Sequence, residues 1–250
     1  MLLAGKVAVI SGAASPRGIG FATARLFAAQ GARVAILDLD EAAASDAASG
    51  LGAEHRGFAC DVADPAACKE AARRVLEAFG QVDILINNAG ISQPVKTMEI
   101  LPDDLHRIMS VNLDGVLYLS QAFIPHMRER RQGSIACMSS VSAQRGGGIF
   151  GGPHYSAAKA AVLGLAKAMA RELGPDGIRV NCVTPGLIQT DITGGKLTDE
   201  MRAEIIKGIP LGRLGDADDV AGIYLFLASD LSAYVTGAVI DVNGGMLIHG

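Results

Sequence analysis

The residues with the clearest capacity for chemistry are Tyr155 and Lys159, with Ser140 fifteen positions before the tyrosine. On a helix, side chains at positions i and i+4 lie on the same face, so we expect the phenol and the ammonium to point the same way. A phenol with a pKa of about 10 is a poor base at neutral pH, and a nearby ammonium favours its charged form. The spacing predicts a proton-transfer site, although a surface tyrosine beside a surface lysine gives the same pattern by chance.

Short apolar runs rich in β-branched residues predict the strands that would position such a site. They lie at residues 7–10, 33–37, 57–60, 82–86, 134–138, 178–183 and 238–242. Their hydrophobicity is continuous rather than alternating, which is typical of parallel strands buried on both faces. Alanine-rich helical patterns separate them, for example at residues 19–30, 65–79, 101–130 and 155–173. The alternation predicts an α/β fold of the Rossmann type, a doubly wound parallel sheet of about seven strands.

Length, composition and charge bound the class of protein. The 250 residues contain no repeat, charge block or low-complexity tract, so we expect a single domain over residues 1–250. A net charge of -4 with both signs mixed predicts neither a nucleic-acid partner nor an anionic membrane. No apolar run reaches the ~18 residues of a membrane span, and the first ten residues show no secretion signal. A cytoplasmic location is therefore expected.

Cysteine and histidine spacing gives no sign of a metal. The cysteines are Cys60, Cys68, Cys137 and Cys182, without any C-x-x-C pair. The histidines are His55, His106, His126, His154 and His249. Neither a zinc site nor a disulfide framework is suggested, so we predict buried thiols and no metal cofactor.

A glycine-rich turn at residues 11–20 follows the first predicted strand and precedes a helix. Glycines there allow close approach of a pyrophosphate, which a helix N-terminus stabilises through free N–H groups and its dipole. Asp38 closes the second strand, eighteen residues after Gly20, where a carboxylate can bind an adenosine ribose or simply be solvated. Polar turns at 61–62 and 87–90 follow the next two strands. Together these features predict a dinucleotide site at the carboxyl edge of the sheet.

With these motifs in this order, the chain resembles the short-chain dehydrogenase/reductase family over nearly its whole length. The motifs are the glycine turn, Asp61, residues 87–90, Asn112, Ser140, Tyr155 with Lys159, and Pro185-Gly186 followed by Thr190. The resemblance implies a catalytic tetrad of Asn112, Ser140, Tyr155 and Lys159, in which Ser140 fits better than Ser139. It implies cofactor contacts from Gly12, Ser15, Arg17, Gly18, Ile19, Gly20, Asp38, Asp61, Val62, Asn88, Ala89, Gly90, Tyr155, Lys159, Pro185, Gly186, Ile188 and Thr190. It also suggests a homotetramer.

The chain departs from the family pattern in two loops. Five residues separate Gly12 from Gly18 where the family usually has three, so pyrophosphate contacts from Ala14 and Ser15 are left open. The loop at residues 144–154 is longer than usual and holds five glycines. Candidate substrate contacts around it are Ser142, Arg145 and His154, although a solvated arginine is the simpler view of Arg145. A substrate lid is expected at residues 187–208, with Thr193-Gly194-Gly195 and a helical stretch at 199–207.

The expected reaction is hydride transfer between a secondary alcohol or ketone and nicotinamide. Tyr155 would be the acid/base, and Lys159, with the charge of oxidised nicotinamide, is expected to lower the pKa of Tyr155 and to hold the ribose. Ser140 would hydrogen-bond the substrate oxygen. Asn112 looks like the residue that keeps a relay water behind Lys159, a role compatible with a helix-interior asparagine that bonds the backbone.

Asp38, with Asp40 close by and no cation at Leu39, favours NAD over NADP, because a 2′-phosphate would meet like charge. The expected substrate is a small, polar, hydroxylated molecule such as a polyol, a sugar or a hydroxy acid. Two alternatives stay open. One is an NADPH-dependent reductase of 3-oxoacyl thioesters, for which Arg17 argues, since family members that use NADP often place a basic residue just before that glycine. The other is a nicotinamide-binding sensor or scaffold without turnover.

Overall fold

The computed structural model describes residues 1–147, 150–191 and 197–248. Seven parallel strands form one sheet in the order β3-β2-β1-β4-β5-β6-β7. The strands are β1 (Val7–Ser11), β2 (Arg33–Asp38), β3 (Arg56–Ala59), β4 (Ile84–Asn87), β5 (Gly133–Met138), β6 (Ile178–Pro185) and β7 (Val239–Val242). Every residue of β1, β4 and β5 is buried, which explains their unbroken hydrophobic runs. The predicted Rossmann-type fold is confirmed.

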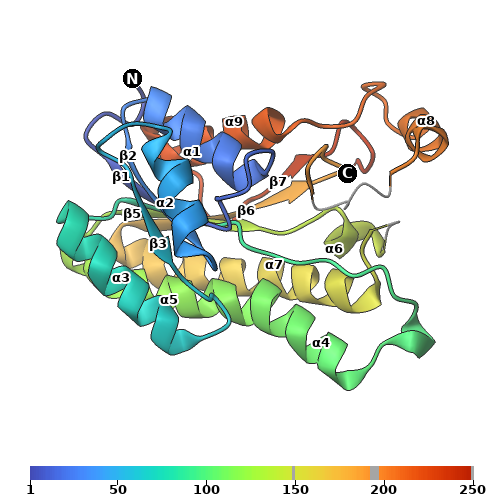
Figure 1. Ribbon diagram of the computed structural model, residues 1–250, viewed down its shortest axis with the longest axis horizontal. Helices are drawn as coiled ribbons and strands as arrows, with labels where there is room; N and C mark the ends of the chain where they lie inside the picture. The colour runs from blue at the N-terminus through green and yellow to red at the C-terminus, as the bar shows by residue number, and fades with distance from the viewer. Residues whose placement is uncertain (148–149, 192–196, 249–250) are drawn as a thin grey trace.

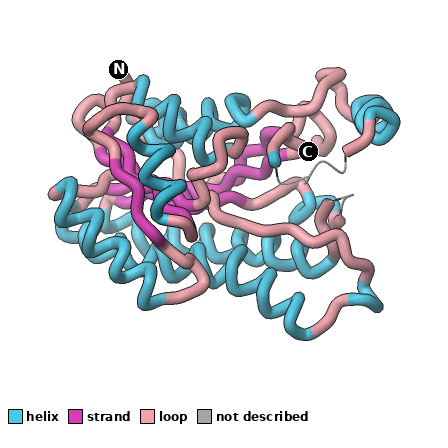
Figure 2. The backbone as a smooth tube through the Cα atoms, in the orientation of Figure 1, coloured by secondary structure: helices cyan, strands magenta, loops and turns pink. Residues whose placement is uncertain are grey.

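Helices cover both faces of the sheet (Figures 1 and 2). One face carries α1 (Ile19–Ala29), α2 (Glu41–Ser49) and α9 (Ala217–Ala228), and the other carries α3 (Pro65–Phe79), α5 (Gly115–Arg130) and α7 (Pro153–Leu173). Each helical layer packs against the sheet and forms a hydrophobic core of its own, with Phe27 and Tyr224 in one core and Phe123 and Val162 in the other. The sheet is therefore the shared inner layer of a three-layer molecule.

The strand order reverses between β1 and β4, which lie side by side at the centre of the sheet. Outside the carboxyl ends of such neighbouring strands, the connecting turns separate and leave a crevice. The turns after β1, β4, β5 and β6 contribute Gly12, Asn88, Ser140 and Gly186 to that crevice. The fold thus brings together the motifs that the sequence spreads over most of the chain.

The predicted helix over residues 101–130 is divided in the structure. It consists of α4 (Pro102–Met109), a π-helical turn η2 (Ser110–Asp114) and α5. All three parts continue one helical path, so hydrophobic periodicity does not reveal the wider turn. The π-helical turn contains Asn112, and such turns are frequent at functional sites.

Short elements complete the chain. They are η1 (Thr97–Glu99), α6 (Ser142–Arg145), η3 (Gly174–Asp176), α8 (Asp199–Lys207) and η5 (Asp230–Ser232). Helix α8 coincides with the helical stretch predicted in the lid, whereas Thr193-Gly194-Gly195 lies outside the described residues. Within the described ranges no helix has the length and apolarity to cross a membrane. All four cysteines are free and buried, as predicted.

Candidate active site

A cavity of about 590 Å³ lies at the carboxyl edge of the sheet. Most of the residues singled out in the sequence line it. These are Gly12, Ser15, Gly18, Ile19, Asp38, Asp61, Val62, Asn88, Ala89, Gly90, Asn112, Ser140, Ser142, Arg145, Tyr155, Lys159, Pro185, Gly186, Ile188 and Thr190. Three do not line it, namely Arg17, Gly20 and His154. A cavity of this size is typical of sites that bury a ligand of cofactor or drug size.

The glycine turn packs directly on the turn that follows β4. Gly12 has φ +63°, and a Cβ on it would lie 2.7 Å from the Cα of Ala89, so only glycine allows the two backbones to approach this closely. The Asn88 side-chain amide donates to the carbonyls of Ser11 and Gly12, both at 2.9 Å. Gly20 packs behind this contact, against the Gly12 carbonyl. The floor of the cavity is therefore a rigid backbone junction between β1 and β4.

The N-terminus of α1 opens toward the same floor. Its N-cap is Gly18, which supplies no side-chain cap, and the first turn contains no acidic residue. The first N–H groups of a helix have no partner within the helix and carry partial positive charge. This end of the cavity therefore fits the pyrophosphate of a dinucleotide.

Asp38 is held at the cavity wall by two backbone donors. Its Oδ2 accepts from the Ala14 N–H and its Oδ1 from the Leu39 N–H, both at 2.9 Å. The carboxylate thus has a fixed orientation beside the glycine turn, at the place where an adenosine ribose is expected. Asp61 lines the same end, and its Oδ1 accepts from the Ala63 N–H at 2.9 Å.

Arg17 has a protein partner and lies off the cavity wall. Its guanidinium forms an ion pair with Asp191, and the Ser15 hydroxyl donates to the same carboxylate at 3.1 Å. Asp191 itself lines the cavity. The carboxyl group draws its lowered pKa mainly from the hydrogen bond with Arg17. Both polar side chains of the inserted turn are thus engaged by one carboxylate from the segment after β6.

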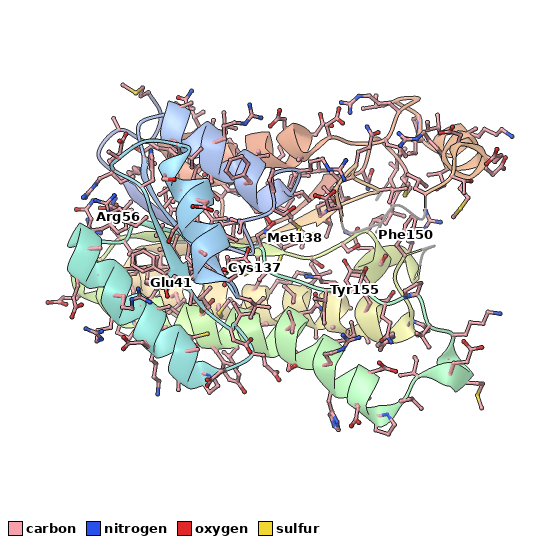
Figure 3. All side chains as sticks on the ribbon, in the orientation of Figure 1. Glu41, Arg56, Cys137, Met138, Phe150 and Tyr155 are labelled. Atoms are coloured by element: carbon pink, nitrogen blue, oxygen red, sulfur yellow. The ribbon has the colours of Figure 1, made fainter. Side chains whose placement is uncertain are left out.

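Tyr155, Lys159 and the two serines meet where β5 ends and α7 begins. Lys159 Nζ lies 5.9 Å from the centre of the Tyr155 ring and donates to the Met138 carbonyl at 3.0 Å. The Ser139 hydroxyl points away and donates to the Lys159 carbonyl at 2.7 Å, which leaves Ser140 as the serine that bonds Tyr155. Figure 3 shows Met138 near the end of β5, with Tyr155 and Phe150 farther to the right.

Burial dominates the electrostatics of this pair. Desolvation raises the pKa of Tyr155 above its ordinary value, and the hydrogen bond with Ser140 lowers that pKa by less. Desolvation also lowers the pKa of Lys159 to about 8. We expected Lys159 to lower the pKa of Tyr155. The structure shows no such effect of Lys159, because the ammonium is itself desolvated and donates to the Met138 carbonyl.

Asn112 offers a buried acceptor next to Lys159. Its Nδ2 donates to the carbonyls of Ile91 at 2.9 Å and Ile108 at 3.0 Å, whereas its buried Oδ1 has no hydrogen-bond partner in the part of the chain that the structure describes. A Cβ on Gly90 would lie 2.7 Å from Asn112 Oδ1 and 3.2 Å from Lys159 Nζ, so both atoms face the space that this glycine leaves open. A buried carbonyl oxygen without a donor is costly, and a water molecule there would satisfy it.

The remaining wall is largely apolar, and its residues were not named individually as site residues, although Leu187, Asp191 and Ile205 lie in the expected lid and Gly147, Phe150 and Gly151 in the glycine-rich loop. The additional lining residues are Leu39, Cys60, Ile91, Ser92, Val111, Met138, Ser139, Val141, Gly147, Phe150, Gly151, Leu187, Asp191, Ile205 and Met246. They come from distant segments and share no local motif, so only the folded chain shows that they are neighbours. A helical apolar residue such as Ile205 gives no signal beyond ordinary packing.

His154, one of the three candidate substrate contacts, is buried away from the cavity wall. Its Nε2 pairs with Gln93 Oε1 at 2.9 Å, and the Gln93 amide donates to Asp104 at 2.8 Å. The histidine therefore joins the start of α7 to the segment before α4. Ser142 and Arg145 remain at the cavity.

A sheet edge whose turns fit a dinucleotide, with a tyrosine–lysine pair at its centre, is typical of nicotinamide-dependent oxidoreductases. Residues 12–247 match the family model described as enoyl-(acyl carrier protein) reductase. The chain is 74% identical to an uncharacterized short-chain type dehydrogenase/reductase, y4mP, of Sinorhizobium fredii, over the full length of both. It is 42% identical to 3-oxoacyl-[acyl-carrier-protein] reductase FabG of Escherichia coli, with 97% of each chain covered. FabG of Thermotoga maritima is 41% identical, with 99% of this chain and 100% of the relative covered.

The chain therefore belongs to the short-chain dehydrogenase/reductase family of oxidoreductases, as the sequence motifs predicted. Members of this family use a nicotinamide cofactor. The residues present fit such a group, because the uncapped start of α1, the fixed carboxylate of Asp38 and the unpartnered Oδ1 of Asn112 all face one cavity.

Proposed function

We propose that this protein is an NAD(H)-dependent oxidoreductase that interconverts a secondary alcohol and a ketone. The observation that carries the proposal is the meeting of Tyr155, Ser140, Lys159 and Asn112 on the wall of one cavity at the carboxyl edge of the sheet. The bound nicotinamide would supply the hydride acceptor or donor. The protein would supply binding, orientation and proton transfer.

In this proposal Tyr155 exchanges the proton of the substrate hydroxyl, as general base in oxidation and general acid in reduction. Ser140 donates a hydrogen bond to the substrate oxygen and keeps it in line with the phenol. Lys159 holds positive charge within 5.9 Å of the Tyr155 ring centre, and the raised pKa of Tyr155 explains why further positive charge is needed before the phenol ionises. Asn112 Oδ1 accepts from a water that takes part in a proton relay behind Lys159.

NAD is the proposed cofactor because the described wall around the adenosine end presents carboxylates rather than free cations. Asp38 stands beside the glycine turn, and the one arginine of that turn, Arg17, is paired with Asp191. A 2′-phosphate there would meet negative charge and would lose the ribose hydrogen bond to Asp38. Measuring kcat/KM with NAD and with NADP tests the proposal, and a clear preference for NADP would contradict it.

The proposed substrate is a small polar secondary alcohol, a polyol, a sugar or a hydroxy acid, supported by Ser92, Ser142 and Arg145 on the wall. A second candidate is reduction of 3-oxoacyl thioesters, supported by the apolar residues Phe150, Leu187, Ile205 and Met246 on the same wall and by the printed names of two relatives. A panel of polyols, sugars, hydroxy acids and hydroxyacyl thioesters, read by nicotinamide absorbance, separates the two. Much faster turnover of thioesters would overturn the first candidate.

The quaternary structure and location expected from the sequence, a homotetramer in the cytoplasm without nucleic-acid or membrane partners, stay predictions. Sedimentation of the purified protein tests the first of these.

A further inference from the structure

Arg145 is a cation on the cavity wall that has no partner among the described residues. It ends α6, lines the cavity with Ser142 and Tyr155, and is exposed. Within the described ranges its guanidinium forms neither an ion pair nor a hydrogen bond, while the other cation on the described wall, Lys159, donates to the Met138 carbonyl. A guanidinium at the mouth of a ligand cavity, with all five donors open, is suited to bind an oxyanion through its planar fork.

Carboxylates of the cavity wall and of β7, next to the neighbour of Arg145, already accept hydrogen bonds from other donors. Gln144, its neighbour on α6, donates to Asp241 Oδ1 at 2.9 Å and thereby ties α6 to β7. On the cavity wall itself, Asp191 is held by Arg17 and Ser15, and Asp38 by two backbone N–H groups. Arg145 is thus positioned by a tethered helix but not neutralised, which leaves a local positive charge for a ligand.

Four apolar side chains line the same cavity as Arg145. Phe150 follows α6, Leu187 follows β6, Ile205 belongs to α8 and Met246 follows β7. Phe150 and Tyr155 lie on the same side of the molecule in Figure 3. A polyol would place hydroxyl groups against these side chains, and each buried hydroxyl left without a hydrogen-bond partner would cost binding free energy. A hydrocarbon segment would instead gain binding free energy from the apolar surface that it removes from water.

We propose that the substrate is an amphipathic anion, a hydroxy or keto compound whose carboxylate or phosphate binds Arg145 and whose hydrocarbon part packs on Phe150, Ile205 and Met246. This inference rests on the proposed function, since it places the reacting oxygen at Tyr155 and Ser140. It narrows the substrate class, because it excludes both neutral polyols and uncharged aliphatic alcohols as preferred substrates.

The test compares substrates that differ only in charge. Kinetics with 3-hydroxyalkanoic acids of about four to eight carbons, their methyl esters and a phosphate monoester of a diol give kcat/KM for each. The kcat/KM for the acid or for the phosphate should exceed that for the ester by about tenfold or more, which is the gain expected from one exposed charge-assisted hydrogen bond. Whichever of the two anions is favoured identifies the oxyanion that Arg145 binds. The Arg145→Met variant should lose this preference through a raised KM for the anion, and Arg145→Lys should retain part of it.

A binding measurement makes the test independent of turnover. Calorimetry of hexanoate and of hexanamide with the NAD-saturated protein should show tighter binding of the anion, and Arg145→Met should remove the difference. Phe150→Ser should weaken binding of hexanoate more than binding of propionate. The matched control is Arg107→Met on α4, which removes a cation away from the cavity wall.

Equal kcat/KM for acids, phosphate and esters in the wild type would overturn the inference. So would a decrease in kcat/KM in Arg145→Met that is equal for charged and neutral compounds. Either result leaves the proposed function intact, because turnover is still observed. Absence of turnover with every compound and both cofactors would overturn the proposed function itself, and this inference with it.

Discussion

The two ends of the cavity are formed by different kinds of chemical groups. At the adenosine end, backbone groups and half-exposed charges dominate: the start of α1, Asp38 held by two N–H groups, and the ion pair of Arg17 with Asp191. At the reacting end, Lys159 and Asn112 are buried, and burial shifts the pKa of both Tyr155 and Lys159. At the adenosine end the charged side chains have partners within the protein, whereas the reacting end holds a desolvated cation and a carbonyl oxygen that accepts from no described residue.

This difference indicates how each end would work. Satisfied groups at the surface define a shape and a charge pattern at little energetic cost, which suits recognition of a nucleotide. Buried and unsatisfied groups store free energy that a ligand can release, which suits chemistry. Substitutions at the reacting end should therefore have larger effects than substitutions at the adenosine end.

The largest effect is expected for Tyr155→Phe, which removes the transferable proton and keeps the ring. Since general acid/base groups typically contribute ~10²- to 10⁴-fold, kcat should fall by that factor while NAD affinity changes little. Stopped-flow absorbance and fluorescence titration measure the two quantities. The control is Tyr234→Phe, at a fully exposed tyrosine outside this cavity, which should behave as wild type. Near-normal turnover in Tyr155→Phe would remove Tyr155 from the mechanism.

The chemistry of this end was largely foreseeable, and its energetics were not. Tyr155 and Lys159 are four residues apart on one helix, so helix geometry alone predicts that they share a face. The direction of the Tyr155 pKa shift depends on how deeply the site is buried and on where Lys159 Nζ points, and the Met138 carbonyl that fixes Nζ is contributed by β5. Sequence spacing contains no information on either.

The second effect, on stability, follows from the burial of Lys159. Its pKa is about 8 in the folded protein against an ordinary value of 10.5, a difference of about 2.5 units or ~3 kcal/mol. Between these two pH values the unfolded chain binds a proton that the folded protein has released, so the free energy of unfolding should rise with pH across that window. Below pH 8 the full penalty for the buried ammonium applies.

Lys159→Met should therefore remove turnover and yet stabilise the protein at pH 7 by up to ~3 kcal/mol, with a smaller gain above pH 10. Urea unfolding of the protein without added nucleotide, at pH 7 and at pH 10, measures the difference from wild type. Lys167→Met, at an exposed lysine of the same helix, serves as the control and should show no such pH dependence. A destabilised Lys159→Met at pH 7 would mean that the hydrogen bond to Met138 outweighs the desolvation of the ammonium.

A smaller effect is expected at the adenosine end from Asp38→Ala. Loss of a charge-assisted hydrogen bond to the ribose costs roughly 1.5–3 kcal/mol, so the ratio of kcat/KM for NADP over NAD should rise at least about tenfold. The control is Asp40→Asn, which removes a nearby exposed charge but leaves an oxygen to cap α2. A ratio that stays constant in Asp38→Ala, or that moves equally in Asp40→Asn, would contradict a specific contact from Asp38.

The adenosine end also shows where sequence patterns were sufficient and where they were not. Strand, glycine turn and helix follow one another within residues 7–29, so local signals predicted this part of the fold closely. Arg17 looked like a free cation because its partner, Asp191, is 174 positions away in the sequence. At the reacting end, proximity in sequence was equally misleading. His154 is next to Tyr155 in the sequence but lies off the cavity wall, whereas Ile205 on α8 lines the cavity. Contacts between distant segments decide all of these cases.

The smallest effect should come from Asp191→Asn, and it tests whether the Arg17 pair matters to cofactor choice at all. The pair is exposed, and such pairs contribute little, so releasing Arg17 should raise the affinity for NADP relative to NAD by no more than about fivefold. Calorimetry with 2′,5′-ADP and 5′-AMP measures this without catalysis. The same substitution in the Arg17→Met background should have no effect, and Asp218→Asn, which breaks the exposed pair with Arg25, is the matched control. A rise well above tenfold would mean that Asp191, rather than Asp38, sets the preference for NAD, and the adenosine end would then depend on a charge from the segment after β6.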